Sequence, residues 1–213
     1  MQAYNLPMVL PEMVRVKRSD DETSGEEEAL MAAYARGDQQ AFERLFSLLA
    51  PRVHGFFLRK FGNPAVADDM LQITFMKVHR ARKDYRIGAP VRPWLFTIAA
   101  RVRLDELRRR GRRPEDADPD TLDRAAASAD VRRAAVEDDL VERKDIAAKV
   151  REALDALPES QRVVVQLHRY EEFTFDEIAQ ILGSTEGAVK LRAFRAYEKL
   201  RAHLAPLLAG AVG

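Results

Sequence analysis

The sequence contains no cysteine among its 213 residues. This absence excludes disulfide bonds, thiol chemistry and cysteine-bearing zinc sites within the chain. The four histidines (His54, His79, His168 and His203) are scattered and lack the HExxH or paired spacing of zinc ligands. A glycine-rich phosphate loop and a GxSxG elbow are also missing. We therefore expect no catalytic residue, no metal site and no cofactor, and the sequence predicts a protein that is not an enzyme.

Long apolar runs are missing as well. The longest are far shorter than the roughly 20 residues that a membrane-spanning helix needs, and the N-terminal segment lacks the basic-then-apolar order of a signal peptide. We therefore expect a cytoplasmic protein without membrane insertion. Aromatic residues make up only 8% of the chain, whereas alanine, leucine, arginine and glutamate are abundant. Because this composition favours helices and no strand-like alternation of useful length occurs, the sequence predicts an all-α fold.

Charge is distributed unevenly, although the formal net charge is only +1. Residues 80–113 contain 12 basic and 3 acidic residues, a net charge of +9. Residues 114–148 contain 5 basic and 11 acidic residues, a net charge of −6. A basic block therefore lies next to an acidic one. Two roles stay open for the acidic segment: it shields the basic block in the free protein, or it is a passive spacer.

Changes in composition divide the chain into four segments. Residues 1–25 are irregular and end in an acidic stretch, which predicts a mobile N-terminal arm. Residues 26–113 and 141–208 have helical periodicity and are predicted to form two small helical domains. Residues 114–140 are small, acidic and contain proline, which predicts a flexible acidic linker between the two domains.

Apolar spacing and helix-breaking residues predict where the helices of the first domain begin and end. Residues 41–49 carry an apolar stripe at helical spacing, and Pro51 is expected to start a new turn or to kink that helix. The tripeptide at residues 62–64, Gly-Asn-Pro, predicts the end of one helix and the start of the next. Pro93 is expected to be the first residue of another helix.

Residues 175–199 carry the pattern of a helix-turn-helix. Residues 175–182 form a short amphipathic stretch with Ile178, Ala179 and Leu182 on its inner face. Gly183 suits the turn because glycine tolerates a left-handed backbone, and Ser184 or Thr185 can cap the next helix. That helix has small residues for close packing (Ala188, Val189, Ala193 and Ala196) and a row of cations (Lys190, Arg192, Arg195 and Lys199).

A helix that enters the major groove of DNA needs this arrangement, with small apolar residues behind and long cationic side chains in front. An ordinary amphipathic helix with a solvated basic face has the same periodicity. The turn chemistry and the short partner helix favour the DNA-binding interpretation. The basic block at residues 80–113 also contains Tyr85, Trp94 and Phe96, and cations combined with aromatic faces are typical of single-stranded DNA binding. Alternatively, Trp94 and Phe96 belong to the core.

The segments LPESQR, DEIAQILG and EGAVKLRAFRA, in this order, resemble domain four of the extracytoplasmic-function sigma factors. The resemblance implies that the second helix of the helix-turn-helix binds the distal promoter element through Lys190, Leu191, Arg192, Phe194 and Arg195. Leu191 departs from the family, in which many members have a small polar residue. Glu186 is an unusual residue so close to DNA.

The segment VADDMLQITFMKVH resembles the polymerase-docking helix in domain two of the same family, and RPWLFTIAARVRLDELRRRGRR resembles its promoter-reading helix. The resemblance implies that Asp69, Gln72 and Phe75 bind RNA polymerase, whereas Ile73 and His79 depart from the pattern. For promoter melting and base capture it implies Tyr85, Arg86, Trp94, Arg101, Arg103 and Arg108. Arg101 replaces the asparagine that the family usually has in its pocket for a flipped base, and Tyr85 occupies the matching aromatic position on the facing loop.

The resemblance implies a sigma factor that binds core RNA polymerase and directs promoter-specific transcription initiation. Its implied partners are core RNA polymerase, promoter DNA in duplex and single-stranded form, and an anti-sigma factor. Two alternatives stay open. One is a helix-turn-helix DNA-binding regulator, which the missing α/β alternation in the first hundred residues disfavours. The other is a decoy that sequesters an anti-sigma factor without promoter activity of its own, which the intact basic faces disfavour.

Overall fold

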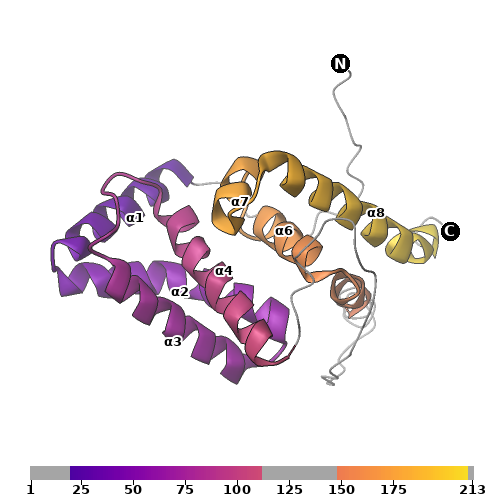
Figure 1. Cartoon of the computed structure of the whole chain (residues 1–213), viewed down its shortest axis with the longest axis horizontal. Helices are drawn as coiled ribbons and strands as arrows, with labels where there is room; N and C mark the ends of the chain where they lie inside the picture. Colours follow the sequence, from indigo (N-terminus) through magenta and orange to yellow (C-terminus); the bar gives the residue numbers. More distant parts are fainter. Residues whose placement is uncertain (1–19, 112–147, 211–213) are drawn as a thin grey trace, which may run out of the picture.

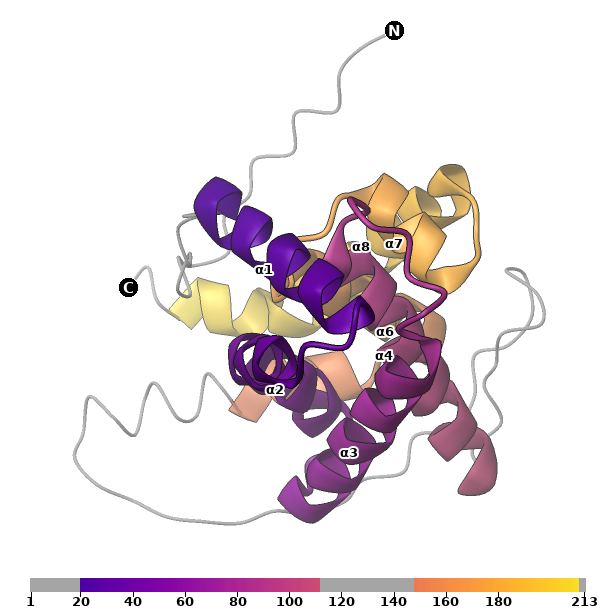
Figure 2. The same ribbon diagram turned by 90° about the vertical axis from the view of Figure 1, so that its left-hand side faces the viewer.

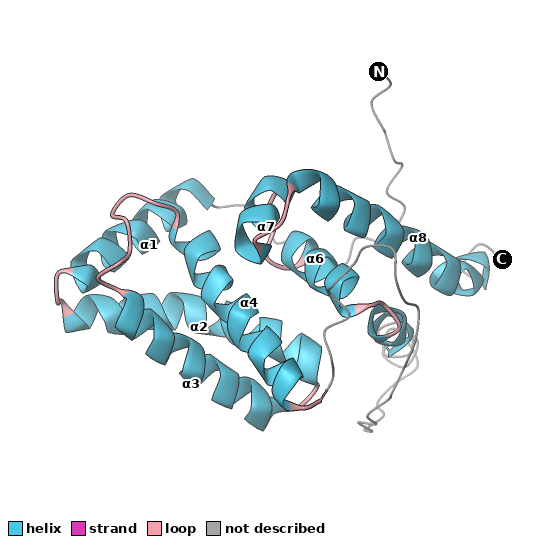
Figure 3. Ribbon diagram, in the orientation of Figure 1, coloured by secondary structure: helices cyan, strands magenta, loops and turns pink. Residues whose placement is uncertain are grey.

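The computed structural model describes residues 20–111 and 148–210. Every regular element in these two ranges is an α-helix, which confirms the predicted all-α fold (Figure 1, Figure 3). The helices are α1 (Asp20–Ala35), α2 (Gln39–Phe61), α3 (Pro64–Ala81), α4 (Val91–Arg109), α6 (Glu159–Arg169), α7 (Phe175–Leu182) and α8 (Glu186–Gly210). Residues 148–155 are also helical. None of the described helices is both long and apolar enough to cross a membrane.

Helices α1 to α4 form an N-terminal bundle in which α2 packs against both α1 and α3, and α3 packs against α4. The apolar stripes that face one another are buried, with Leu45 and Phe56 of α2 and Leu95 of α4 at most 1% exposed. Phe56 contacts Phe57 and Phe96, at ring-centroid distances of 5.5 and 5.6 Å. Burial of this apolar surface is the main stabilising contribution to the bundle.

The boundary between α2 and α3 lies where the sequence predicts it. Gly62 has a left-handed backbone (φ 64°) and its amide donates to the carbonyl of Leu58, which closes α2. The side chain of Asn63 then accepts a hydrogen bond from the amide of Ala65 at 2.9 Å, and Pro64 is the first residue of α3. Pro51, in contrast, starts no new helix, because α2 continues through it.

Two helix starts differ from the expectations. Helix α1 begins at Asp20, inside the segment predicted as a mobile arm, and residues 1–19 lie outside the described residues. Helix α4 begins at Val91 rather than at Pro93. A proline is tolerated there because the first amides of a helix have no intrahelical acceptor. The predicted acidic linker, residues 114–140, lies outside the described residues.

Helices α6, α7 and α8 form a C-terminal helical unit whose local structure follows from its capping residues. Thr174 and Glu177 form a capping box at the start of α7. Gly183 ends α7 with φ 62°, as the sequence predicts. The hydroxyl oxygen of Thr185 accepts a hydrogen bond from the amide of Ala188 at 3.2 Å and so caps α8. The turn that these caps define is the turn of a helix-turn-helix.

The N-terminal bundle and the C-terminal helical unit pack directly against each other through α4 and α7 (Figure 1, Figure 2). Phe96 of α4 meets Phe173, which precedes α7, edge to face at 5.2 Å between ring centroids. Both rings are buried, and the apolar core continues without a break from the bundle into α6, α7 and the first turns of α8. The sequence predicts two helical units, but it gives no sign of this contact between them.

Candidate nucleic-acid interface

Helix α8 presents a cationic surface on a rigid support. Its inner face consists of small residues, and Val189, Ala193 and Ala196 are at most 2% exposed. This close packing brings the backbone of α8 near α6 and α7 and leaves its other face in solvent. The five residues expected to bind DNA all lie outside the core. Of these, Lys190, Leu191 and Phe194 are exposed, whereas Arg192 and Arg195 are half-buried.

The exposed face of α8 also contains an acid and two large apolar side chains. Glu186 forms an ion pair with Lys190 at 2.8 Å, so the acid that is unusual near DNA orients the first cation of the row. Leu191 is 44% and Phe194 is 52% exposed. Apolar side chains at such positions can contact the methyl group of thymine in the major groove. The face therefore offers both cationic and apolar contacts to a base edge.

Helix α4 divides the arginines expected to act in promoter melting between two environments. Arg101 and Arg108 are exposed, and Arg108 lies 3.8 Å from Asp105. Arg103 is only 1% exposed, because it points towards the C-terminal helical unit instead of solvent. In this arrangement Arg103 cannot reach DNA, so its expected role at the promoter stays a prediction that requires the C-terminal helical unit to move away. The physical reason is that a position two residues from Arg101 lies on a different face of the helix.

The loop between α3 and α4, residues 82–90, holds Tyr85 in the core. Tyr85 is 5% exposed, its hydroxyl donates to the carbonyl oxygen of Ala89, and its ring lies edge to face against Trp94 at 5.1 Å. Burial raises the pKa of the Tyr85 hydroxyl. The ring expected to stack on a base is thus buried, and Trp94 beside it is half-buried against the core. Arg86 is exposed, and the neighbouring Ile87 is 58% exposed.

Helix α3 exposes two of the three residues expected to bind polymerase. Asp69 and Gln72 are exposed, one turn apart. Phe75 is 5% exposed and packs edge to face on Phe46 at 4.7 Å, so it supports the surface from below. The exposed apolar side chains of α3 are instead Ile73 and Met76, at 39% and 50%. The signal that could have identified them is their position outside the apolar stripe of α3.

Glu159 of the C-terminal helical unit reaches into the N-terminal bundle. It accepts a hydrogen bond from Arg103 Nε at 2.6 Å and forms an ion pair with Lys60. The amide oxygen of Gln166 accepts a second hydrogen bond from Arg103. Burial raises the pKa of Glu159, but Arg103 and Lys60 lower it by more, so the net direction is downward. Burial lowers the pKa of Lys60 to about 8. Glu159 is therefore held as a carboxylate between two cations.

A second glutamate makes a similar contact at the turn after α6. Glu171 has a side chain that is 2% exposed and lies 3.3 Å from Arg52 Nε, and it forms a further ion pair with Arg59. Burial raises the pKa of Glu171, against the effect of Arg59 and Arg52. The guanidinium of Arg59 also lies over the ring of Tyr170, 4.5 Å from its centroid. Sequence reasoning missed both glutamates, because their partners lie 56 to 119 positions away and have no local signature.

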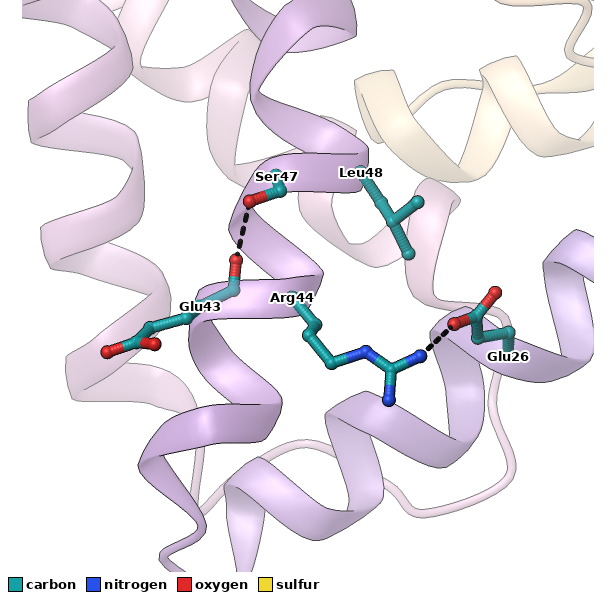
Figure 4. Close-up of a pocket in the computed structure, with 5 residues that line it drawn as sticks. All are labelled: Glu26, Glu43, Arg44, Ser47 and Leu48. Atoms are coloured by element: carbon teal, nitrogen blue, oxygen red, sulfur yellow. Dashed lines mark hydrogen bonds and ion pairs between the residues drawn. The ribbon is translucent and has the colours of Figure 1, made fainter.

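The chain also has an open hollow between α1 and α2, lined by Glu26, Glu43, Arg44, Ser47 and Leu48 (Figure 4). Arg44 spans it to Glu26 at 2.7 Å, and the side chains of both residues are largely exposed. A solvated ion pair of this kind stabilises little. Within residues 20–111 and 148–210, no three His, Asp or Glu side chains are grouped so that they could hold a metal ion.

Comparison with known proteins identifies the family of this chain. Residues 45–113 match the family model described as Sigma-70 region 2, and residues 147–200 match the one described as Sigma-70, region 4. The RNA polymerase sigma factor CarQ of Myxococcus xanthus is 40% identical over 83% of this chain and 97% of its own length. The chain belongs to the extracytoplasmic-function group of RNA polymerase sigma factors. The ECF sigma factor SigM of Mycobacterium tuberculosis H37Rv is 32% identical over 91% of this chain and 87% of its own length.

Solved structures agree with this family. The structure of CnrH in complex with the cytosolic domain of CnrY has a TM-score of 0.62 and 27% sequence identity to this sigma factor, covering 85% of this chain and 98% of CnrH. RpoE of Bartonella quintana, solved with the anti-sigma factor NepR, has the same fold, with a TM-score of 0.57 and 24% sequence identity. The match covers 77% of this chain and 96% of that RpoE chain. The N-terminal bundle thus contains sigma region 2, and the C-terminal helical unit contains sigma region 4.

Proposed function

We propose that this sigma factor binds core RNA polymerase through α3 and recognises a promoter through two separate surfaces, α8 for the distal element and the α3–α4 region for the melted element. The observation that carries the proposal is the exposed face of α8. There Lys190, Arg192 and Arg195 project from a helix whose other face is closely packed. Cations on a rigid helix contribute phosphate and base contacts without large losses of conformational freedom.

The polymerase surface is proposed to centre on Asp69 and Gln72, with the apolar side chains of Ile73 and Met76 beside them. These four side chains are exposed on α3. A surface with an apolar centre and charged neighbours is typical of a specific protein interface. Phe75 is buried beneath it and packs on Phe46 of α2.

For the melted element, we propose Arg86, Arg101 and Arg108 as the residues available to single-stranded DNA. All three are exposed around α4 and the loop before it. Tyr85 can offer a stacking face only if the loop moves, because its ring now packs on Trp94. An anti-sigma factor as a regulator, a cytoplasmic location and the absence of enzymatic activity follow from membership of the family and belong to the same proposal.

Transcription from a randomised promoter library with purified core polymerase tests this function. We expect the full chain to direct transcripts from a restricted set of promoters, and core enzyme alone to give none of them. A chain that binds DNA by itself but directs no transcript would be the regulator described above. A chain that binds an anti-sigma factor but neither DNA nor polymerase would be the decoy.

A further inference from the structure

We propose that four side chains of the N-terminal bundle, Arg52, Arg59, Lys60 and Arg103, form a binding surface for the phosphate backbone of promoter DNA that the C-terminal helical unit covers in the free sigma factor. We call these four residues the cationic patch. The inference rests on the proposed function, since it assumes that promoter DNA is the ligand. It adds three cations of α2 to Arg103, which the family resemblance already implies at the promoter, and a reason why the free chain keeps that surface closed.

The charges of this contact are unequal. Four cations of the bundle face two carboxylates of the C-terminal helical unit, Glu159 and Glu171, so each carboxylate is shared by two cations. When the C-terminal helical unit moves away, four positive charges are left on one surface. Duplex DNA carries a negative charge about every 1.7 Å along its axis. A phosphate backbone therefore offers more acceptors to the cationic patch than the two glutamates do.

Hydrogen bonding within the contact is also incomplete. Arg59 Nε is a buried donor that makes no hydrogen bond, and Arg103 Nη2 lies 2.6 Å from Glu159 as an ion pair without hydrogen-bond geometry. A buried donor without an acceptor weakens the closed arrangement. Phosphate oxygens accept from several guanidinium donors at once, so DNA can satisfy the Arg59 donor that Glu171 leaves unused. The two carboxylates hold the positions that phosphates would take.

Because it is buried, the cationic patch cannot bind DNA while it contacts Glu159 and Glu171. The side chains of Arg103 and Lys60 are 2% and 7% exposed, and those of Arg52 and Arg59 are both 29% exposed. The contact centres on the Phe96–Phe173 pair, and α4 lies directly against α7 (Figure 1). DNA can reach Lys60 and Arg103 only after α4 and α7 separate. The same movement uncovers the face of α4 that carries Arg103, whereas Arg101 and Arg108 are already exposed.

The test uses the full chain with Glu159→Gln and Glu171→Gln, which remove two charges and keep the side-chain shape. We expect this variant to bind short promoter DNA at low salt, without polymerase, about tenfold more tightly than wild type and with a steeper salt dependence. The matched control is Glu152→Gln with Glu198→Gln, which changes the net charge equally at two exposed sites, one in the helical stretch 148–155 and one on α8. We expect the control to bind as wild type does.

Separation of the C-terminal helical unit from the N-terminal bundle is measured in the wild type, the glutamine variant and the control. Because the chain has no cysteine, Asp68→Cys on α3 and Ala202→Cys on α8, both at exposed positions, can carry a fluorophore pair. The Glu159→Gln, Glu171→Gln variant should show lower energy transfer between the two fluorophores than wild type, and the control should show the same energy transfer as wild type. Adding Arg52→Ala and Arg59→Ala should abolish the gain in DNA affinity. Unchanged DNA binding, or an equal gain in the control, overturns the proposal.

A second measurement keeps the proposal testable if the glutamine variant does not fold. In an otherwise wild-type chain, Arg52→Ala with Arg59→Ala should lower the salt slope of promoter binding by holoenzyme by about two. An unchanged slope overturns the cationic patch. If promoter-specific transcription by the wild-type chain persists while these results are negative, only this inference fails and the proposed function stands. If wild type directs no transcription, the proposed function itself fails.

Discussion

Helices α4 and α8 both carry rows of arginine and lysine, yet they present them in different ways. On α8 the cations lie outside the core, with Lys190 exposed and Arg192 and Arg195 half-buried. On α4 the row is divided, since Arg101 lies in solvent whereas Arg103 is enclosed by Glu159 and Gln166. The recognition surface of α8 is thus exposed in the free chain, and part of α4 is covered.

This difference shows how a tertiary contact changes the meaning of a basic residue. An exposed arginine keeps its hydration and costs the fold little. A buried one must be paired, and removal of either partner leaves an uncompensated charge in the interior. The same residue type therefore lies outside the core on α8, where we propose that it binds DNA, and links two helical units on α4.

The largest expected effect comes from Arg103→Met, which keeps most of the side-chain volume and removes the charge. Because Glu159 then faces only Lys60 in a buried environment, we expect a loss of about 3 to 5 kcal/mol in the free energy of unfolding. Urea denaturation followed by circular dichroism measures it. Arg101→Met on the exposed face of α4 is the control and should change stability by less than about 0.5 kcal/mol. Equal effects of the two substitutions would show that Arg103 is not enclosed in solution.

A second prediction concerns the exposed row on α8. Alanine at Lys190, Arg192 and Arg195 together should weaken promoter binding by holoenzyme by at least about 3 kcal/mol, because each lost base contact costs about 1 to 3 kcal/mol. The salt slope should also fall by about one for each lost phosphate contact. Filter binding across a salt series measures both quantities, and Arg201→Ala, further along α8, is the control. Unchanged binding would remove α8 as the recognition helix.

Charge reversal at Asp69 addresses a surface that lies outside both rows of cations. Asp69→Lys should weaken binding to core polymerase about tenfold, with normal circular dichroism because Asp69 is exposed. The matched control is Asp68→Lys, at the neighbouring exposed position, where the native carboxylate lies 3.2 Å from His54. A titration with labelled core enzyme compares the two variants. If they bind equally well, the polymerase surface does not include Asp69.

Arg101→Asn tests what the exposed part of α4 does. Arginine has five donors and no acceptor, so it favours a base that presents acceptors, such as guanine or thymine, over adenine. Asparagine supplies both groups, and we expect a shift of about 1 kcal/mol in base preference at one position of the melted element. Transcription from a library randomised across that element measures it. A uniformly weaker profile without a shift would make Arg101 a phosphate contact.

The smallest effect is expected from low pH, through protonation of Glu106 near the end of α4. Hydrogen bonds from Arg109 and Arg110 lower the pKa of Glu106 to about 2. Because the folded carboxyl binds its proton less tightly than the unfolded one, its contribution to stability is complete above about pH 4.3 and is lost as the pH falls towards 2. Thermal unfolding between these limits should show a weaker pH dependence in Glu106→Gln than in wild type. An identical dependence would contradict this assignment.

Much of the local structure could be predicted from the sequence because it depends on residues close together in the chain. The end of α2 at Gly62, the start of α3 at Pro64 and the turn at Gly183 all follow from backbone preferences. The packing face of α8 follows from helical periodicity, and its cations lie outside the core as expected. These features need no knowledge of distant partners.

The sequence by itself therefore determined the helical class, the helix-turn-helix and the residues that face solvent on α8. The tertiary structure decided which other faces are covered. Tyr85 packs on Trp94, Phe75 lies beneath the surface of α3, and Arg103 pairs with Glu159 across 56 positions of the chain. The physical reason is that periodicity assigns a residue to one side of a helix, whereas burial depends on which distant element packs there. Only the fold brings the glutamates of one unit against the arginines of the other.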